Sequence, residues 1–221
     1  MARPKGGYKT KDGKRAEGVT TIIGRFKDSG ALLWWAFEQG KAAERGEIKS
    51  LYDKRDAAAD AGTLAHSLVE AHIKKQPLPK LPDNDIGKAA QQGYENYLQW
   101  ESNSRITFVE TEIELVSETY RFGGCPDAIG MDTQGRACII DFKTSSSGPY
   151  TDWLLQLAAY KILWLENHPL EPIIGGFHLL KFSKENADFS HFYWSELNEA
   201  EEYFILILKA YSLDKKLKKR I

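Results

Sequence analysis

Two short segments carry side chains suited to phosphodiester chemistry. Asp127 closes the run Gly-Gly-Cys-Pro-Asp, and Asp141 and Lys143 stand two apart in the run Ile-Ile-Asp-Phe-Lys. Alternate side chains of a strand share a face, so Asp141 and Lys143 should project together while Phe142 turns into the core. A neighbouring strand joined by a tight turn would bring Asp127 beside Asp141. Asp-x-Lys alone is more typical of a surface cross-strand pair.

Two carboxylates beside an ammonium form a site for a hard cation. Mg²⁺ prefers oxygen ligands and retains several waters, so two carboxylates and a substrate phosphate suit it. Such an ion would polarise a phosphodiester and deliver hydroxide, while Lys143 would orient the attacking water or neutralise developing charge.

Two helical segments supply further polar groups. Gln156 and Tyr160 are four residues apart, hence on one face of the helix that follows the lysine strand. His66 and Glu70 have the same spacing in a segment that begins at Gly62. An imidazole there would complete a metal shell or hold its water, whereas a lone histidine on a helix is more often packed or exposed.

The hydrophobic pattern predicts the elements that must position these groups: an α/β fold with a central mixed sheet flanked by helices, in the order helix, three strands, helix, strand, after a helical N-terminal half. We expect one domain over residues 1–221. It would comprise a helical part over about 19–105, a catalytic core over about 62–194 and a C-terminal helix over about 195–217. The predicted helices are about 29–45, 50–75, 83–100 and 150–167; the predicted strands are 106–116, 120–131, 136–142, 172–182 and 189–194.

Composition limits the class of protein. The chain has 221 residues, 42% hydrophobic and 28% charged, which is ordinary for a globular domain. The apolar run 204–208 is too short to span a bilayer and no secretory signal is visible, so a cytoplasmic protein without a membrane segment is expected. Cys125 and Cys138 are the only cysteines. They suit a reducing compartment as buried fillers, and they are too few for an iron–sulfur cluster held by four cysteines.

Charge is unevenly distributed. Residues 1–17 hold six Lys or Arg against two acidic residues, and residues 209–221 hold six against one. The remainder carries 18 basic and 28 acidic residues. Basic ends around an acidic centre would suit a polyanion held at the edges of a cation site, or they are solubilising tails.

The motifs taken together resemble the RecB-like branch of the PD-(D/E)XK nuclease superfamily. Gly-Thr-x-x-His (62–66), Gly-Gly-x-x-Asp (123–127), Asp-x-Lys (141–143) and Gln-x-x-x-Tyr (156–160) occur in that order over about 100 residues. The segment 19–23 also looks like one that opens phage and mitochondrial members. The resemblance implies a core of helix, three strands, helix and strand.

The resemblance also implies roles for single residues. Asp127, Asp141 and the backbone carbonyl of Phe142 would bind the metal with His66, Lys143 would be the catalytic lysine, and Gln156 and Tyr160 would steady the site and the DNA backbone. Glu112 resembles a strand glutamate upstream of the Gly-x-x-Asp motif, and Glu70 would contact the metal ligands but not the metal itself. Members that need four cysteines for an iron–sulfur cluster are poor matches.

The aromatic residues allow two interpretations. Trp34 and Trp35 lie on a helix expected near the site and, if exposed, would stack on single-stranded bases. Tryptophan at helical spacing is usually core, however, and core is the favoured interpretation, more strongly so for Tyr94, Tyr97 and Trp100.

The hypothesis is a metal-dependent DNA nuclease, an exonuclease acting at DNA ends in repair, recombination or phage DNA processing. It would use Mg²⁺, for which Mn²⁺ would substitute, and its partners would be DNA with a free end, single- or double-stranded, and a recombination or replication protein. The alternatives are a structure-selective or restriction-type endonuclease, a non-catalytic DNA-binding module of the same fold, and a scaffold subunit that needs a partner.

Overall fold

The computed structural model describes residues 6–27, 30–47, 53–145, 147–183 and 188–221. The predicted helix starts at residues 29 and 50 lie outside these ranges. The helices are α1 (Val19–Phe26), α2 (Gly30–Glu44), α3 (Asp53–Ile73), α4 (Asp85–Ser104), α5 (Thr151–Asn167) and α6 (Asn198–Lys218). The strands are β1 (Tyr8–Lys9), β2 (Arg15–Gly18), β3 (Thr107–Thr111), β4 (Leu115–Val116), β5 (Phe122–Gly124), β6 (Ala128–Met131), β7 (Ala137–Thr144), β8 (Ile173–Phe182) and β9 (Phe189–Trp194).

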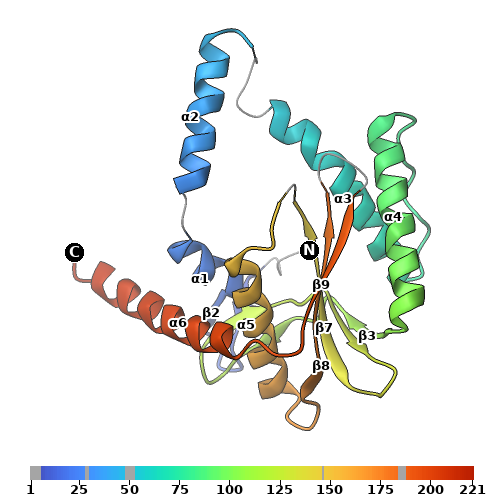
Figure 1. The fold of residues 1–221 in the computed structure, drawn as a ribbon. Coiled ribbons are helices and arrows are strands. Elements are labelled where there is room, and N and C mark those ends of the chain that lie inside the picture. The colour runs from blue at the N-terminus through green and yellow to red at the C-terminus, as the bar shows by residue number, and fades with distance from the viewer. Residues whose placement is uncertain (1–5, 28–29, 48–52, 146, 184–187) are drawn as a thin grey trace.

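A five-stranded sheet forms the centre of the molecule, in the order β3-β6-β7-β8-β9 (Figure 1). Strand β7 pairs with β8 in parallel, and the other neighbours are antiparallel. Helix α5 makes the crossover that a parallel pair requires. The predicted fold class, a mixed sheet flanked by helices, is therefore confirmed.

Helices cover both faces of this sheet. Ile139 packs in a core with residues of α1, α5 and α6, such as Leu157 and Phe204. The next residue, Ile140, packs in a second core with α3 and α4, together with Phe142. This alternation along β7 aims Asp141 and Lys143 toward α5 and leaves Phe142 on the α3 side, as the strand spacing predicts.

Two predicted strands are each divided in the structure. The predicted strand 106–116 breaks after β3, where Glu112 has a left-handed φ of 51°, and β4 joins a second sheet of order β1-β2-β5-β4. The predicted strand 120–131 breaks at residues 125–127 between β5 and β6. Residues 125–127 therefore lead from the small sheet to the large sheet, and Asp127 is the last residue before β6.

Helix α2 stands away from the rest of the molecule (Figure 1). No described helix or strand forms an extended contact with it, and Trp34 and Trp35 are 65% and 40% exposed. The core interpretation of these two tryptophans is therefore wrong, because no second layer covers their helix. Tyr94, Tyr97 and Trp100 are buried as predicted. Among the described residues, no helix combines the length and apolar character needed to cross a membrane.

Candidate active site

The two aspartates meet where β6 begins. Ala128 pairs with Ile140, so the register places Asp127 opposite Asp141. Because β6 starts only at Ala128, the N–H of Phe142 lacks a strand partner on this side, and it donates instead to Oδ2 of Asp127 at 2.7 Å. Asp127 is 6% exposed and Asp141 is fully buried. Because β6 begins only at Ala128, the carboxylate of Asp127 takes the place of a backbone carbonyl as the acceptor for the N–H of Phe142.

The aspartate pair is electrostatically unfavourable by itself. Burial, and then the neighbouring charge of Asp141, raise the pKa of Asp127 well above its ordinary value. Neither carboxylate oxygen of Asp141 accepts a hydrogen bond from a described residue, although the ammonium of Lys143 forms an ion pair with its Oδ2. One ammonium facing two buried carboxylates leaves negative charge that a further cation would neutralise.

A chain of polar contacts runs from Lys143 into α5. The ammonium donates to Oε1 of Gln156 at 3.0 Å, and Nε2 of Gln156 donates to the hydroxyl of Tyr160 at 2.5 Å. Tyr160 is 2% exposed, and burial raises its pKa well above the ordinary value. A Cβ at Gly124 would come within 2.8 Å of Cε1 of Tyr160. The glycine of the Gly-Gly-x-x-Asp segment therefore lets this helix approach.

Helix α3 approaches the sheet from the opposite side. A Cβ at Gly62 would come within 2.1 Å of Cγ2 of Thr144 and 3.0 Å of the carbonyl oxygen of Ser183, so only glycine allows this closeness. One turn later, the ring of His66 lies 5.5 Å from that of Phe142, centroid to centroid. Burial lowers the pKa of His66. The lowered pKa favours the neutral imidazole, which is the form that binds a metal ion or accepts a proton from water.

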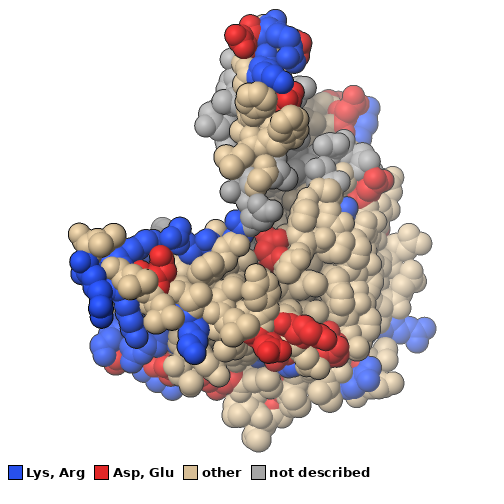
Figure 2. All heavy atoms as spheres, turned by 60° about the vertical axis from the view of Figure 1, so that its left-hand side comes forward, with Lys and Arg blue, Asp and Glu red and all other residues tan. Residues whose placement is uncertain are grey.

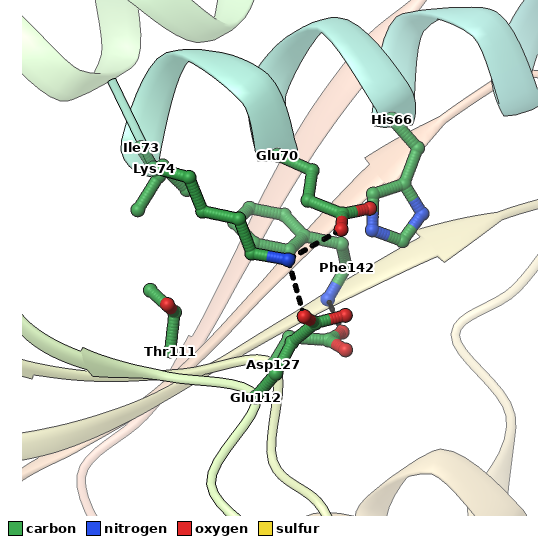
Figure 3. Close-up of a pocket in the computed structure, with 8 residues that line it drawn as sticks. All are labelled: His66, Glu70, Ile73, Lys74, Thr111, Glu112, Asp127 and Phe142. Atoms are coloured by element: carbon green, nitrogen blue, oxygen red, sulfur yellow. Dashed lines mark hydrogen bonds and ion pairs between the residues drawn. The ribbon is translucent and has the colours of Figure 1, made fainter. Parts of the chain in front are cut away.

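His66 and Asp127 line one small cavity, of about 20 Å³, with Glu70, Glu112 and Phe142 (Figure 3). This volume has room for at least one water-sized group. The two sides of the large sheet therefore meet here: the α3 side contributes His66, and the β6–β7 edge contributes the aspartate.

Lys74 is a charged residue of the cavity that the sequence analysis did not single out. Its ammonium lies 2.6 Å from Oε1 of Glu70 and pairs with Glu112 as well (Figure 3). These contacts raise the pKa of Lys74 and lower that of Glu70. The spacing of four residues between Glu70 and Lys74 is a sequence signal for this ion pair. Glu112 also donates its backbone N–H to the carbonyl of Asp127 at 3.0 Å, which ties its turn to the site.

The model of the PD-(D/E)XK nuclease superfamily matches residues 86–203, more than half of the chain. This chain belongs to the PD-(D/E)XK nuclease superfamily. Nucleases of this superfamily generally use divalent metal ions.

The solved structures that match this chain include those of two exonucleases. A candidate exonuclease from Eubacterium rectale is 13% identical with a TM-score of 0.46, over 68% of this chain and 64% of that chain. The present chain thus spans less than two thirds of its length. The alkaline exonuclease LHK-Exo from Laribacter hongkongensis is 12% identical with a TM-score of 0.30, over 75% of this chain and 93% of that chain. No curated protein matches the sequence.

The residues of this chain fit a divalent cation held by two carboxylates. Asp141 has two buried oxygens without a hydrogen-bond donor, and the charged pair needs a counterion. Within the ranges that the structure describes, no three His, Cys, Asp or Glu side chains already converge as a ready-made metal cage. Mg²⁺ does not require such a cage, because it is commonly bound through one or two carboxylates and keeps several waters.

The structure thus groups the predicted site residues in two sets. Asp141, Lys143, Gln156 and Tyr160 form a row on the α5 side, and His66, Glu70 and Glu112 border the cavity with Asp127 and Phe142. Trp34 and Trp35 belong to neither set, because α2 stands apart from both.

Proposed function

We propose that this protein is a nuclease, a metal-dependent deoxyribonuclease that removes nucleotides from DNA ends. The observation that carries the proposal is the buried pair Asp127 and Asp141, which shares one ammonium, from Lys143, and leaves the oxygens of Asp141 without hydrogen bonds. Breaking a phosphodiester requires charge stabilisation at the phosphorus oxygens and an oriented water. This pair, with its lysine, supports both requirements.

Asp127, Asp141 and the carbonyl of Phe142 would hold Mg²⁺ or Mn²⁺, with His66 beside them in the same cavity. When bound, the ion would supply Lewis acidity toward the phosphate and lower the pKa of a bound water. The hydrogen bond from Phe142 holds Asp127 in one orientation. The sheet therefore keeps the two carboxylates together without help from a ligand.

Lys143 would act on the substrate through its ammonium. Gln156 accepts one of its three N–H groups, and Asp141 faces another. This leaves one donor for an attacking water or a non-bridging phosphate oxygen. The hydroxyl of Tyr160 accepts a hydrogen bond from the amide nitrogen of Gln156 and so fixes the orientation of that amide. Gln156 and Tyr160 are thus positioning residues for Lys143.

The exposed aromatic side chains of α2 support a preference for DNA ends. Trp34 and Trp35 project into solvent, where each would stack on an unpaired base, a contact that contributes roughly 1–3 kcal/mol per base. Bases are unpaired where a duplex end frays. A role in repair, recombination or phage DNA processing, together with a recombination or replication protein as partner, belongs to the same proposal.

Digestion of four labelled DNAs tests the proposal. Linear and circular forms, each single- and double-stranded, are incubated with Mg²⁺ or with EDTA. We expect loss of the linear forms with Mg²⁺, intact circles, and no cleavage in EDTA. Nicking or opening of the circles would show that the protein is an endonuclease and not an exonuclease. Binding of all four DNAs without cleavage would show that the protein is a non-catalytic DNA-binding module.

A Trp34→Ala/Trp35→Ala double variant separates end recognition from chemistry. It should cleave single strands more slowly at low substrate concentration, while its rate at saturation stays near that of the wild type. Leu33→Ala is the matched control, because Leu33 is 67% exposed on the same helix but has no ring to stack on a base.

A further inference from the structure

A second, larger hollow lies between β2, the residues before β5 and the C-terminal part of α6, and we call it the basic groove. Its volume is about 310 Å³. Its charged lining consists of five basic side chains and one acidic one: Arg15, Arg121, Lys215, Lys216, Lys219 and Glu17. Figure 2 shows the concentration of Lys and Arg at this part of the surface, at lower left. It shares no lining residue with the cavity at the aspartates.

The fold, rather than sequence proximity, assembles the basic groove. Arg15 comes from β2 and Arg121 directly precedes β5, while Lys215 and Lys216 lie in the last turn of α6 and Lys219 caps this helix. The acidic residue is neutralised within the groove, since Lys215 lies 2.6 Å from Oε1 of Glu17. Lys216 forms no ion pair with any described residue, and the same holds for Arg15 and Lys219. Positive charge therefore remains available to a ligand.

The basic groove has neutral hydrogen-bond donors beside its charges. The side chains of Tyr120, Tyr211 and Ser212 also line it. Hydroxyl groups beside Lys and Arg are the usual partners of phosphate and sugar oxygens in protein–DNA contacts. Since Lys216 and Lys219 are three residues apart on one helix, they project from the same face and can contact successive points of one strand.

A strand connects the basic groove to the active site. Strand β5 starts beside Arg121 and leads through Cys125 and Pro126 to Asp127, and β2 runs parallel to it, with Glu17 opposite Phe122. Six residues separate Arg121 from Asp127, which allows at most roughly 20 Å. At about 3.4 Å per base pair, this distance corresponds to roughly six base pairs.

We infer that the basic groove binds the phosphate backbone of duplex DNA, within about six base pairs of the bond that is cleaved. The inference rests on the proposed function for the nature of its ligand. A duplex anchored there would present its end, rather than its middle, to Asp127 and Asp141. The contacts are to the backbone, so binding is independent of base sequence and strongly dependent on salt.

Binding to two hairpin DNAs tests the inference without any cleavage. Their stems have 12 and 4 base pairs, both closed by an uncharged linker, and fluorescence anisotropy in EDTA gives the dissociation constant at several salt concentrations. The variant is Lys216→Ala/Lys219→Ala. The matched control, Lys209→Ala/Lys88→Ala, removes the same charge from exposed helix positions outside the groove.

On the 12-base-pair stem, the groove variant should reduce the slope of log K against log salt by about 0.9 per lost phosphate contact. The same relation predicts roughly an eightfold loss of affinity per contact at 0.1 M salt. The 4-base-pair stem offers fewer phosphates to the groove, so its affinity should change much less between the three proteins. Equal losses for the groove variant and the control, or equal losses on both stems, would overturn the inference.

Polyglutamate tests the other class of ligand, an acidic protein. If the groove variant loses affinity for polyglutamate and keeps its affinity for the 12-base-pair stem, the groove binds a protein and the DNA inference is wrong. These outcomes differ from those of the digestion experiment: a wild type that binds the long stem through the groove but cleaves no DNA would refute only the nuclease proposal.

Discussion

The two sides of the large sheet contribute different kinds of polar groups to the active site. On the α5 side, Lys143, Gln156 and Tyr160 form one row of directed contacts, in which Gln156 and Tyr160 are buried and the side chain of Lys143 is 14% exposed. On the α3 side, Glu70, Lys74 and Glu112 form an ion-pair cluster whose side chains remain 39%, 25% and 30% exposed. Charges act more strongly where water is excluded. We therefore propose that the α5 side performs the chemistry and that the α3 side adjusts the charge of the site.

The largest effect is expected at the point where both sides meet. Asp141→Asn should reduce cleavage with Mg²⁺ by roughly 10³-fold or more, because a bound ion contributes several kcal/mol to the transition state. The fold should persist, since Asn keeps the volume and removes a repelling charge. Steady-state cleavage and thermal unfolding measure the two quantities. Asp85→Asn, on the exposed start of α4, is the control, and more than a few per cent of residual activity would disprove the assignment.

A pair of lysine variants tests the difference between the two sides directly. Lys143→Ala should slow saturated cleavage by roughly 10²–10³-fold with nearly unchanged DNA affinity, because its ammonium stabilises transition-state charge. Lys74→Ala should cost less than about tenfold, since its partners are partly solvated. Single-turnover rates and anisotropy separate rate from affinity. A large affinity loss in Lys143→Ala would instead make this lysine a phosphate clamp, and equal rate losses would remove the distinction between the sides.

His66→Ala should have an intermediate effect. We expect a loss of roughly 10–100-fold at low Mg²⁺, the range typical of removing a residue that supports a metal, with partial recovery at excess metal. Titration of activity with Mg²⁺ and Mn²⁺ measures this recovery. Ser67→Ala, at the next position of α3, is the control. A loss that no metal concentration relieves would indicate that His66 only packs against Phe142.

Short-range patterns predicted the α5 side, whereas the α3 side depended on tertiary structure. A spacing of two in a strand or four in a helix determines which side chains share a face. It was therefore sufficient for Asp141 with Lys143 and for Gln156 with Tyr160. Spacing does not show where a chain changes sheets, and so it could not place Glu112, whose left-handed backbone ends β3.

Exposure was the other quantity that the sequence could not provide. Both α2 and α4 carry several aromatic residues, but among the described elements it is α4 that has the sheet and α3 packed against it. Burial depends on which layers cover a helix, and this follows from contacts far apart in the sequence. The same expectation of burial was therefore right for Tyr94, Tyr97 and Trp100 and wrong for Trp34 and Trp35.

The smallest expected effect concerns stability without metal. The pKa of Asp127 is raised in the folded chain, so this group favours folding at low pH, and its contribution is lost as the pH rises from about 4 through the raised folded value. Asp127→Asn does not titrate and keeps an acceptor for Phe142. Its free energy of unfolding in EDTA should exceed that of the wild type by roughly 1–3 kcal/mol at pH 8.

Urea unfolding at pH 4 and pH 8 measures this difference. It should be small at pH 4 and larger at pH 8, whereas Asp85→Asn should show no such trend. A difference that is independent of pH would mean that the two aspartates do not repel each other in the folded chain.

The lysine between the two carboxylates has a consequence for how ligands cooperate. With both aspartates ionised, Asp127, Asp141 and Lys143 together carry one negative charge. A divalent ion would reverse it to one positive charge, and a phosphodiester would restore neutrality. Each ligand would therefore raise the affinity for the other by the same factor, as thermodynamic reciprocity requires. Metal affinity measured on the DNA-free protein would then underestimate the affinity during turnover, and free metal alone would leave the site with an excess of positive charge.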